Sequence, residues 1–185
     1  MSSAKFKGGV GVLLALASIA GAQAQEYTKS LAPYVPSPES IVTTMLQAAE
    51  VKKDELVYDL GSGDGRVLIA AAKEFHARSI GVEISPSLVQ EAQERIKAEG
   101  LEQQCRVIHG DALEVDLSDA DVVVLYLLTS SNELLRPILE DSLHPGARVV
   151  SHDFEVRGWH PYKVVQEQAH GRTHQIYVYR MPDSR

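Results

Sequence analysis

Hydrophobic positions recur with two different periods along residues 56–152. Short apolar runs predict strands at about 56–60, 79–84, 105–109, 121–128 and 147–152. Between them, apolar residues on one helical face predict helices at about 66–75, 85–100 and 131–143. Pro137 lies inside the last of these helices and is expected to kink or split it. The run 121–128 is nearly all apolar, which is typical of a central strand buried on both faces.

The flanking segments complete the expected fold. Upstream, Ser37 and Pro38 precede apolar residues at helical spacing, so Ser37 is expected to cap a helix there. Downstream, "KVVQEQ" and "THQIYVYR" are β-type runs joined by a short turn, and they predict a hairpin. The alternation of strands and helices predicts an α/β fold. Its Rossmann-like, seven-stranded, mostly parallel sheet would have helices on both faces and an antiparallel C-terminal hairpin.

Composition narrows the class of protein. The chain has 185 residues, 44% of them hydrophobic and 23% charged, which suits a single globular domain. Its net charge of −7 argues against a nucleic-acid partner, which would favour a basic face. The single cysteine, Cys105, excludes an intrachain disulfide and a cysteine metal cluster. The seven histidines show no metal-ligand spacing, so no metal is expected.

The first 24 residues differ from the rest. Two lysines precede an apolar run at residues 8–22, and small residues follow at 22 and 24, which is the order of a secretory signal peptide. That run is shorter than the roughly 20 residues of a membrane span. We therefore expect a signal peptide or a hydrophobic anchor at 1–24, an extended arm at 25–37 and one domain at 38–185. The protein would be exported, or attached to a membrane through residues 8–22.

The stretch "DLGSGDGR", residues 59–66, directly follows the first predicted strand. Ligands of such sheets bind beyond the carboxyl ends of the strands, and glycines let the backbone approach them closely. Arg66 stands where a dinucleotide-binding loop would have its third glycine. A carboxylate at Asp59 would repel a pyrophosphate and suits a ligand with a cationic end. We expect the cofactor to contact the loop residues Gly61, Ser62, Gly63, Asp64 and Gly65.

S-adenosylmethionine fits this pattern because it combines a sulfonium, an amino group, a ribose and an adenine without any phosphate. Asp59 would hold its amino group. Glu83 ends the second predicted strand, where an acid accepts hydrogen bonds from ribose hydroxyls. Asp111 follows the third strand and would accept from the adenine amino group, with the backbone of Ala112 beside it.

Five segments carry a family resemblance: "YVPSP" at 34–38, "VYDLGSGDGR" at 57–66, "GVEISP" at 81–86, "HGDALEVDLSDADVVVLYLL" at 109–128 and "ARVVSHDFEVRGW" at 147–159. Through them the chain resembles class I, seven-stranded S-adenosylmethionine-dependent methyltransferases. It is most similar to the protein-lysine methyltransferases that modify the ATP synthase c subunit and the ADP/ATP carrier, and more remotely to histone lysine methyltransferases of the seven-stranded class. The resemblance implies that the arm carrying Tyr34, Pro36 and Ser37 closes over the cofactor.

The same resemblance implies an acceptor site beside the methyl group. Tyr126 ends the fourth strand, where this class places residues that contact the acceptor. Asp153 follows the fifth strand and is expected to be a structural or acceptor-channel residue. Side chains alternate along a strand, so His152 and Asp153 should point to opposite faces and not act as a pair. The acceptor would be a lysine ε-amine of a protein, and a membrane protein is one such partner.

Two other functions remain open at this point. A non-catalytic S-adenosylmethionine-binding module would keep the loop and lack a usable acceptor channel. A small-molecule or RNA methyltransferase would keep the enzyme and change the acceptor, although the acidic net charge disfavours RNA. Export also conflicts with the cofactor, which is made inside cells.

Overall fold

The computed structural model describes residues 30–183. The expected signal peptide or anchor at 1–24 and the first part of the arm, 25–29, lie outside the described residues. Residues Leu31–Arg185 form one compact unit. Within residues 30–183, none of the helices combines the length and apolarity that a membrane span requires.

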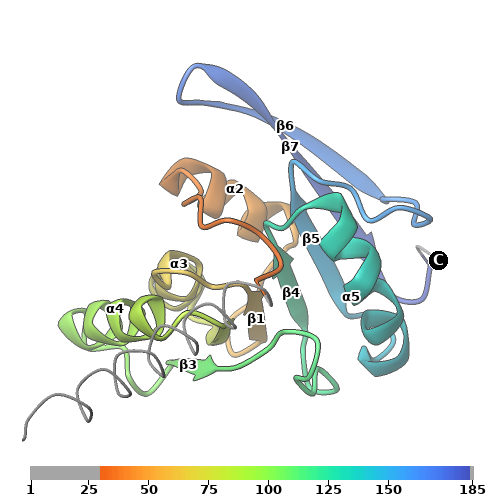
Figure 1. The fold of residues 1–185 in the computed structure, drawn as a ribbon. Helices are drawn as coiled ribbons and strands as arrows, with labels where there is room; N and C mark the ends of the chain where they lie inside the picture. The colour runs from red at the N-terminus through yellow and green to blue at the C-terminus, as the bar shows by residue number, and fades with distance from the viewer. Residues whose placement is uncertain (1–29, 184–185) are drawn as a thin grey trace, which may run out of the picture. The chain divides into compact units, whose positions relative to one another are not determined.

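A seven-stranded sheet with the strand order β3-β2-β1-β4-β5-β7-β6 forms the centre of the unit (Figure 1). Strands β1 to β5 pair in parallel, and β7 pairs antiparallel with both β5 and β6, which confirms the predicted fold class. The strands are β1 (Leu56–Leu60), β2 (Arg78–Glu83), β3 (Cys105–His109), β4 (Val122–Leu125), β5 (Arg148–His152), β6 (Lys163–Ala169) and β7 (Arg172–Arg180).

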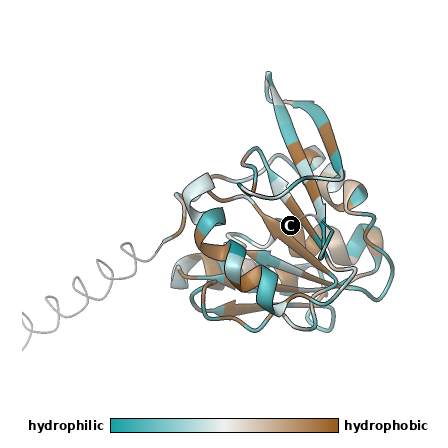
Figure 2. Cartoon of the chain, turned by 90° about the vertical axis from the view of Figure 1, so that its right-hand side faces the viewer, coloured by the Kyte–Doolittle hydropathy of each residue, from teal (hydrophilic) through white to brown (hydrophobic). Residues whose placement is uncertain are grey.

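The helices divide unequally between the two faces of the sheet. Their bounds are α2 (Glu39–Ala48), α3 (Arg66–Phe75), α4 (Pro86–Ala98) and α5 (Thr129–Ser142). Apolar residues of α2 and α3 pack with Val57 and Val124 on one face. On the other face, Leu135 and Leu139 of α5 pack with Tyr58. Figure 2 shows the hydrophobic residues concentrated in the strands that these helices cover.

The sequence predicts β1, α3 and β3 with the bounds that the structure has. The fourth strand is shorter than expected because its register with β5 ends at the pair Leu125 and Ser151. Tyr126 therefore lies just beyond the strand. The last helix continues through Pro137, contrary to a split, and Pro137 is exposed there. Water can therefore hydrate the carbonyl that loses its N–H partner.

Ser37 does not cap α2. The N-cap position is Pro38, and no side chain caps the helix. The Ser37 side chain is buried, and its Oγ lies 3.0 Å from Nδ1 of His152. The prediction was wrong because a tertiary partner from β5 engages the hydroxyl that would otherwise bind the helix N-terminus.

The β6–β7 hairpin projects beyond the other strands (Figures 1 and 2). Its direction follows from the register, because the last residue of β5, His152, pairs with Ile176 of β7. The first residues of β7 therefore extend past the carboxyl end of β5. The turn at His170 and Gly171, both with positive φ, joins β7 to β6 at this end.

Candidate active site

The predicted site residues gather at one edge of the sheet. The carboxyl ends of β1 to β5 meet there because these strands run parallel. Asp59 and Glu83 come from the ends of β1 and β2, and Asp111 follows β3 by two residues. Tyr126 and Asp153 directly follow β4 and β5. The residues expected to hold a cofactor and those expected to face an acceptor thus lie along the same edge.

The glycine-rich loop has the backbone that its sequence predicts. Gly61, Gly63 and Gly65 have φ values of 81°, 53° and 78°, in the left-handed region that favours glycine. The N–H groups of Gly61 and Ser62 both donate to the carbonyl of Val82, at 2.8 and 3.1 Å. Strand β2 therefore fixes the loop before any ligand binds.

Glu83 connects the loop to the start of α4. Its Oε2 accepts a hydrogen bond from the Gly63 N–H at 2.9 Å, and its Oε1 accepts one from the Ser85 N–H at 2.9 Å. A carboxylate offers about four acceptor positions. Glu83 can therefore position the loop and still accept hydrogen bonds from ribose hydroxyls.

Asp59 is buried, and among residues 30–183 the charges that shift its pKa are those of two other carboxylates. Its side chain is 5% exposed. Burial, together with the nearby carboxylates of Glu83 and Asp64, raises its pKa to about 8. Among residues 30–183, no hydrogen bond contributes to this shift. A buried acid of this kind favours a ligand that brings positive charge, so the site fits the amino group of S-adenosylmethionine.

Asp64 has the opposite environment. Its Oδ2 forms an ion pair with Arg66 at 2.7 Å and a second one with Arg95. Burial acts against ionisation, but the hydrogen bonds and charges of the two arginines lower the pKa of Asp64. This carboxylate holds the loop to α3 and α4. The expected contact of Asp64 with the cofactor therefore depends on its backbone rather than its carboxylate.

The arm lies against the glycine-rich loop. A Cβ on Gly63 would lie 2.6 Å from Cε2 of Tyr34, so the Tyr34 ring packs directly against this glycine. Arg66 donates from Nη1 to the carbonyl of Ser37 at 2.6 Å. Pro36, between these contacts, is exposed. The arm is thus attached to the loop at Gly63 and to Arg66, the first residue of α3.

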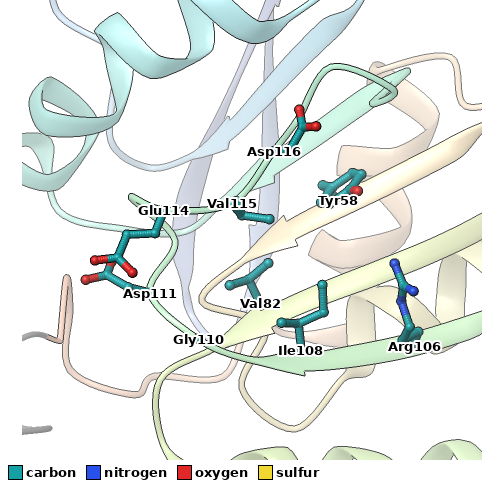
Figure 3. A pocket seen from close by; sticks show the side chains of 9 residues that line it. All are labelled: Tyr58, Val82, Arg106, Ile108, Gly110, Asp111, Glu114, Val115 and Asp116. Atoms are coloured by element: carbon teal, nitrogen blue, oxygen red, sulfur yellow. The ribbon is translucent and has the colours of Figure 1, made fainter.

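Asp111 borders a cavity of about 440 Å³ (Figure 3). Val82 and Ile108 form an apolar wall, and Asp111 and Glu114 lie side by side at one end of the cavity. The Oδ1 of Asp111 accepts the Leu113 N–H at 3.0 Å, which orients the carboxylate. Ala112, next in the chain, is buried. An apolar wall beside an acceptor oxygen suits a planar base with an amino group.

The structure corrects the expected separation of His152 and Asp153. Nε2 of His152 lies 3.3 Å from Oδ2 of Asp153. Alternation ends where β5 ends, and Asp153 has a φ of 60°, in the left-handed region. Its backbone N–H donates to the carbonyl of Gln175 at 2.7 Å, and its Oδ1 accepts the Gln175 N–H at 2.9 Å. This turn brings the carboxylate back toward β7.

His174 completes this cluster and is absent from the sequence prediction. Its Nδ1 lies 2.7 Å from Nε2 of His152 and 3.3 Å from Oδ2 of Asp153. Both imidazoles are at most 2% exposed. Burial lowers the pKa of His152 to about 4, so this side chain is neutral at pH 7. The one sequence signal for His174 is a histidine among the alternating positions of the last strand.

Tyr126 packs on this cluster. Its ring stacks on the His152 ring with centroids 3.8 Å apart and planes inclined by 29°. Burial and the Asp153 carboxylate raise the pKa of Tyr126. Arg172 donates to the Tyr126 hydroxyl at 3.4 Å and to Oδ2 of Asp153 at 2.7 Å. Tyr126 and Asp153, predicted separately, therefore belong to one network.

His152, Asp153 and His174 also have potential metal-ligating atoms within 4.8 Å of one another. The sequence shows no ligand spacing because the three residues come from the ends of two paired strands. Arg172 pairs with Asp153, and the imidazoles bond to each other. These groups therefore form one hydrogen-bonded network, in which the buried Nε2 of His174 has no hydrogen-bond partner among residues 30–183.

Comparison with known proteins agrees with this geometry. A family model described as the ANTKMT methyltransferase domain matches residues 59–163. The chain is 47% identical to a protein-lysine N-methyltransferase of Saccharolobus islandicus, over 80% of this chain and 92% of the relative. It is 32% identical to the ATP synthase c-subunit lysine N-methyltransferase of Xenopus laevis, over 85% of this chain and 69% of the relative.

A solved structure is similar over most of its length. It is described as an RNA methyltransferase from Salinibacter ruber in complex with S-adenosyl-L-homocysteine. The TM-score is 0.76 at 43% sequence identity, and the match covers 81% of this chain and 95% of the other.

Asp59→Asn should raise the stability of the folded protein while weakening its binding of S-adenosylmethionine. The pKa of Asp59 rises from 3.8 to about 8 on folding, so its ionisation destabilises the folded protein as pH increases across this range. Relative to wild type, the variant should gain thermal stability at pH 8 and gain much less at pH 5. It should bind S-adenosylmethionine about tenfold more weakly, because it loses a charged hydrogen-bond acceptor. Thermal unfolding at both pH values and calorimetric titration measure these effects. An equal stability change at pH 5 and pH 8 would contradict the assigned pKa.

Gly63→Ala tests the contact between arm and loop. The added methyl group meets the Tyr34 ring, whereas a Cβ at Gly100, which also has positive φ, meets nothing within 4 Å. Both variants should lose about 1 kcal/mol of stability from backbone strain. Only Gly63→Ala should also weaken S-adenosylmethionine binding, by about tenfold or more, because the arm can no longer lie against the loop. Calorimetric titration measures the affinity of both variants for S-adenosylmethionine. Similar affinities in the two variants would mean that the arm does not cover the cofactor.

Proposed function

The chain belongs to the ANTKMT methyltransferase-domain family and is an S-adenosylmethionine-dependent methyltransferase, and we propose that it methylates a lysine ε-amine of a protein. The observation that carries this proposal is the cluster of Tyr126, Asp153 and a cation at the edge that also holds the cofactor loop. The relative that is 47% identical is named a protein-lysine N-methyltransferase, which supports the same acceptor.

Each part of the cofactor has a matching group in the chain. Asp59 would bind the amino group, Glu83 the ribose hydroxyls, and Asp111 with Ala112 the adenine. The backbone of the loop would surround the centre of the molecule, with the arm above it. The residues are Tyr34, Pro36, Ser37, Gly61, Ser62, Gly63, Asp64 and Gly65. S-adenosylmethionine supplies a methyl group on a positively charged sulfur, which an amine nitrogen can displace in line.

The acceptor side must hold an amine that has lost its proton. A lysine has an unperturbed pKa of about 10.4, so the site must favour the neutral form. The two buried imidazoles and the Tyr126 ring form a poorly hydrated surface, and desolvation lowers the pKa of an amine. Asp153 would orient the incoming ammonium, and Tyr126 would contact its methylene chain. Positioning by these groups would then supply much of the rate.

The proposed acceptor is part of a protein, and the names of two relatives support a membrane protein as the partner. Those relatives are named for the ATP synthase c subunit and the adenine nucleotide translocase. Residues 1–24, as a signal peptide or an anchor, would bring the enzyme to or across a membrane.

RNA is the second candidate acceptor, because a structural relative at 43% identity is described as an RNA methyltransferase. The net charge of −7 favours a protein instead, since an RNA-binding face needs positive charge. The Asp153 carboxylate also favours a positively charged acceptor over an uncharged base.

A labelling experiment distinguishes the two acceptors. The full chain, S-adenosylmethionine with a labelled methyl group and an extract containing membranes and RNA would be incubated together. We expect protease-sensitive, ribonuclease-resistant label, recovered as methyl-lysine by mass spectrometry. Glu83→Ala, which should weaken cofactor binding by about 1–3 kcal/mol, is the control for enzyme dependence. Label that ribonuclease removes would exclude a protein acceptor.

A further inference from the structure

Arg172 pairs with the carboxylate that the proposed function assigns to the incoming ammonium. We propose that Arg172 is the resident cation of the acceptor site, and that the primary alkylammonium of the acceptor binds by replacing it on Asp153. This inference rests on the proposed lysine methylation and names the feature by which the site selects its acceptor.

The contacts of Arg172 coincide with those that an ammonium would need. Its Nη2 lies 2.7 Å from Oδ2 of Asp153 and 3.4 Å from the Tyr126 hydroxyl. The other oxygen of Asp153 already accepts the Gln175 N–H. A second cation beside the same carboxylate would lie close to the Arg172 guanidinium, and like charges repel. The guanidinium and an incoming ammonium should therefore exclude each other.

Arg172 supplies the guanidinium that pairs with this oxygen, and the neighbouring His152 adds no charge. Burial keeps His152 neutral, and its Nδ1 lies beside Ser37 Oγ. His174 bonds to His152 from the other side. If Arg172 left without a replacement, Asp153 would lose the ion pair that helps to keep it ionised. A cationic acceptor can replace the contribution of Arg172, whereas a neutral acceptor brings no positive charge to Asp153.

Arg172 is placed so that it can leave. It is the first residue of β7, directly after the turn at His170 and Gly171, and its side chain is 52% exposed. Among the described residues, its guanidinium has hydrogen bonds only to Asp153 and Tyr126. Ion pairs this exposed contribute little net stability, so an ammonium can compete for Asp153. The hairpin that carries Arg172 extends past the edge where the acceptor must arrive (Figure 1).

This exchange predicts a preference among acceptors. A lysine ε-ammonium restores the pair with Asp153, and its methylene chain can lie along the Tyr126 ring. An uncharged nucleobase would leave either Arg172 in place or Asp153 without a partner. Arg172 would thus act as a specificity-determining residue that favours positively charged acceptors.

Binding of n-butylammonium to the full chain, saturated with S-adenosylhomocysteine, tests the exchange without turnover. The NMR signal of the Arg172 guanidinium, assigned by its loss in Arg172→Gln, reports displacement. We expect n-butylammonium to shift this signal and n-butanol, of the same length but uncharged, to leave it in place. Arg172→Gln should bind n-butylammonium about two- to fivefold more tightly, because the competitor is gone.

Arg78→Gln is the matched control. It removes one positive charge at the start of β2, at the opposite edge of the sheet, where Arg78 donates to the Asp54 carbonyl. Its affinity for n-butylammonium should equal that of wild type. Asp153→Asn should abolish most of the binding.

Two results would overturn the inference: an unchanged affinity in Arg172→Gln, or an Arg172 signal that n-butylammonium does not move. The labelling experiment is independent of both. If n-butylammonium displaces Arg172 but the label is found in RNA, the cation site stands and lysine methylation fails. If methyl-lysine forms while Arg172 stays bound to Asp153, the proposed function stands and the exchange is wrong.

Discussion

The ion pairs of Asp64 are the interaction on which the arrangement of the site depends. Asp64 binds Arg66 and Arg95, which joins the glycine-rich loop to the helices α3 and α4. Arg66 in turn donates to the carbonyl of Ser37, and the Ser37 hydroxyl lies against His152. One continuous series of polar contacts therefore leads from the cofactor loop through the arm to the acceptor cluster. A change at either end can affect the other because every member is at least partly buried.

The pKa values of three aspartates at this edge differ because the charges around them differ. Asp64 and Asp153 are paired with arginines, and the pKa of each is lowered despite burial. Burial and the carboxylates of Glu83 and Asp64 instead raise the pKa of Asp59 to about 8. Pairing stabilises the first two in the free protein. Asp59 instead lowers the stability of the free protein until a cationic ligand binds beside it. Such a loss of stability is common where a site is built for binding.

The acceptor side combines packed aromatic rings with a carboxylate. His152 and His174 are buried, the Tyr126 ring stacks on His152, and Asp153 lies beside both imidazoles. An amine must enter as a cation and react as a neutral nucleophile. The carboxylate would attract the ammonium, and the desolvated aromatic rings would then favour loss of its proton. The hairpin turn lies beside both, so β6 and β7 contribute to the chemistry as well as to the sheet.

Local pattern alone determined the order of strands and helices, the glycine-rich loop and the acids at the ends of β1 and β2. These follow from periods of two and 3.6 residues and from backbone angles that only glycine adopts readily. Packing between distant segments places Ser37 against His152, turns Asp153 back to His152, and brings His174 and Arg172 to them. Those contacts depend on the β5–β7 register and on a left-handed residue just after a strand. No local period encodes either, because the partners are brought together by pairing between distant segments.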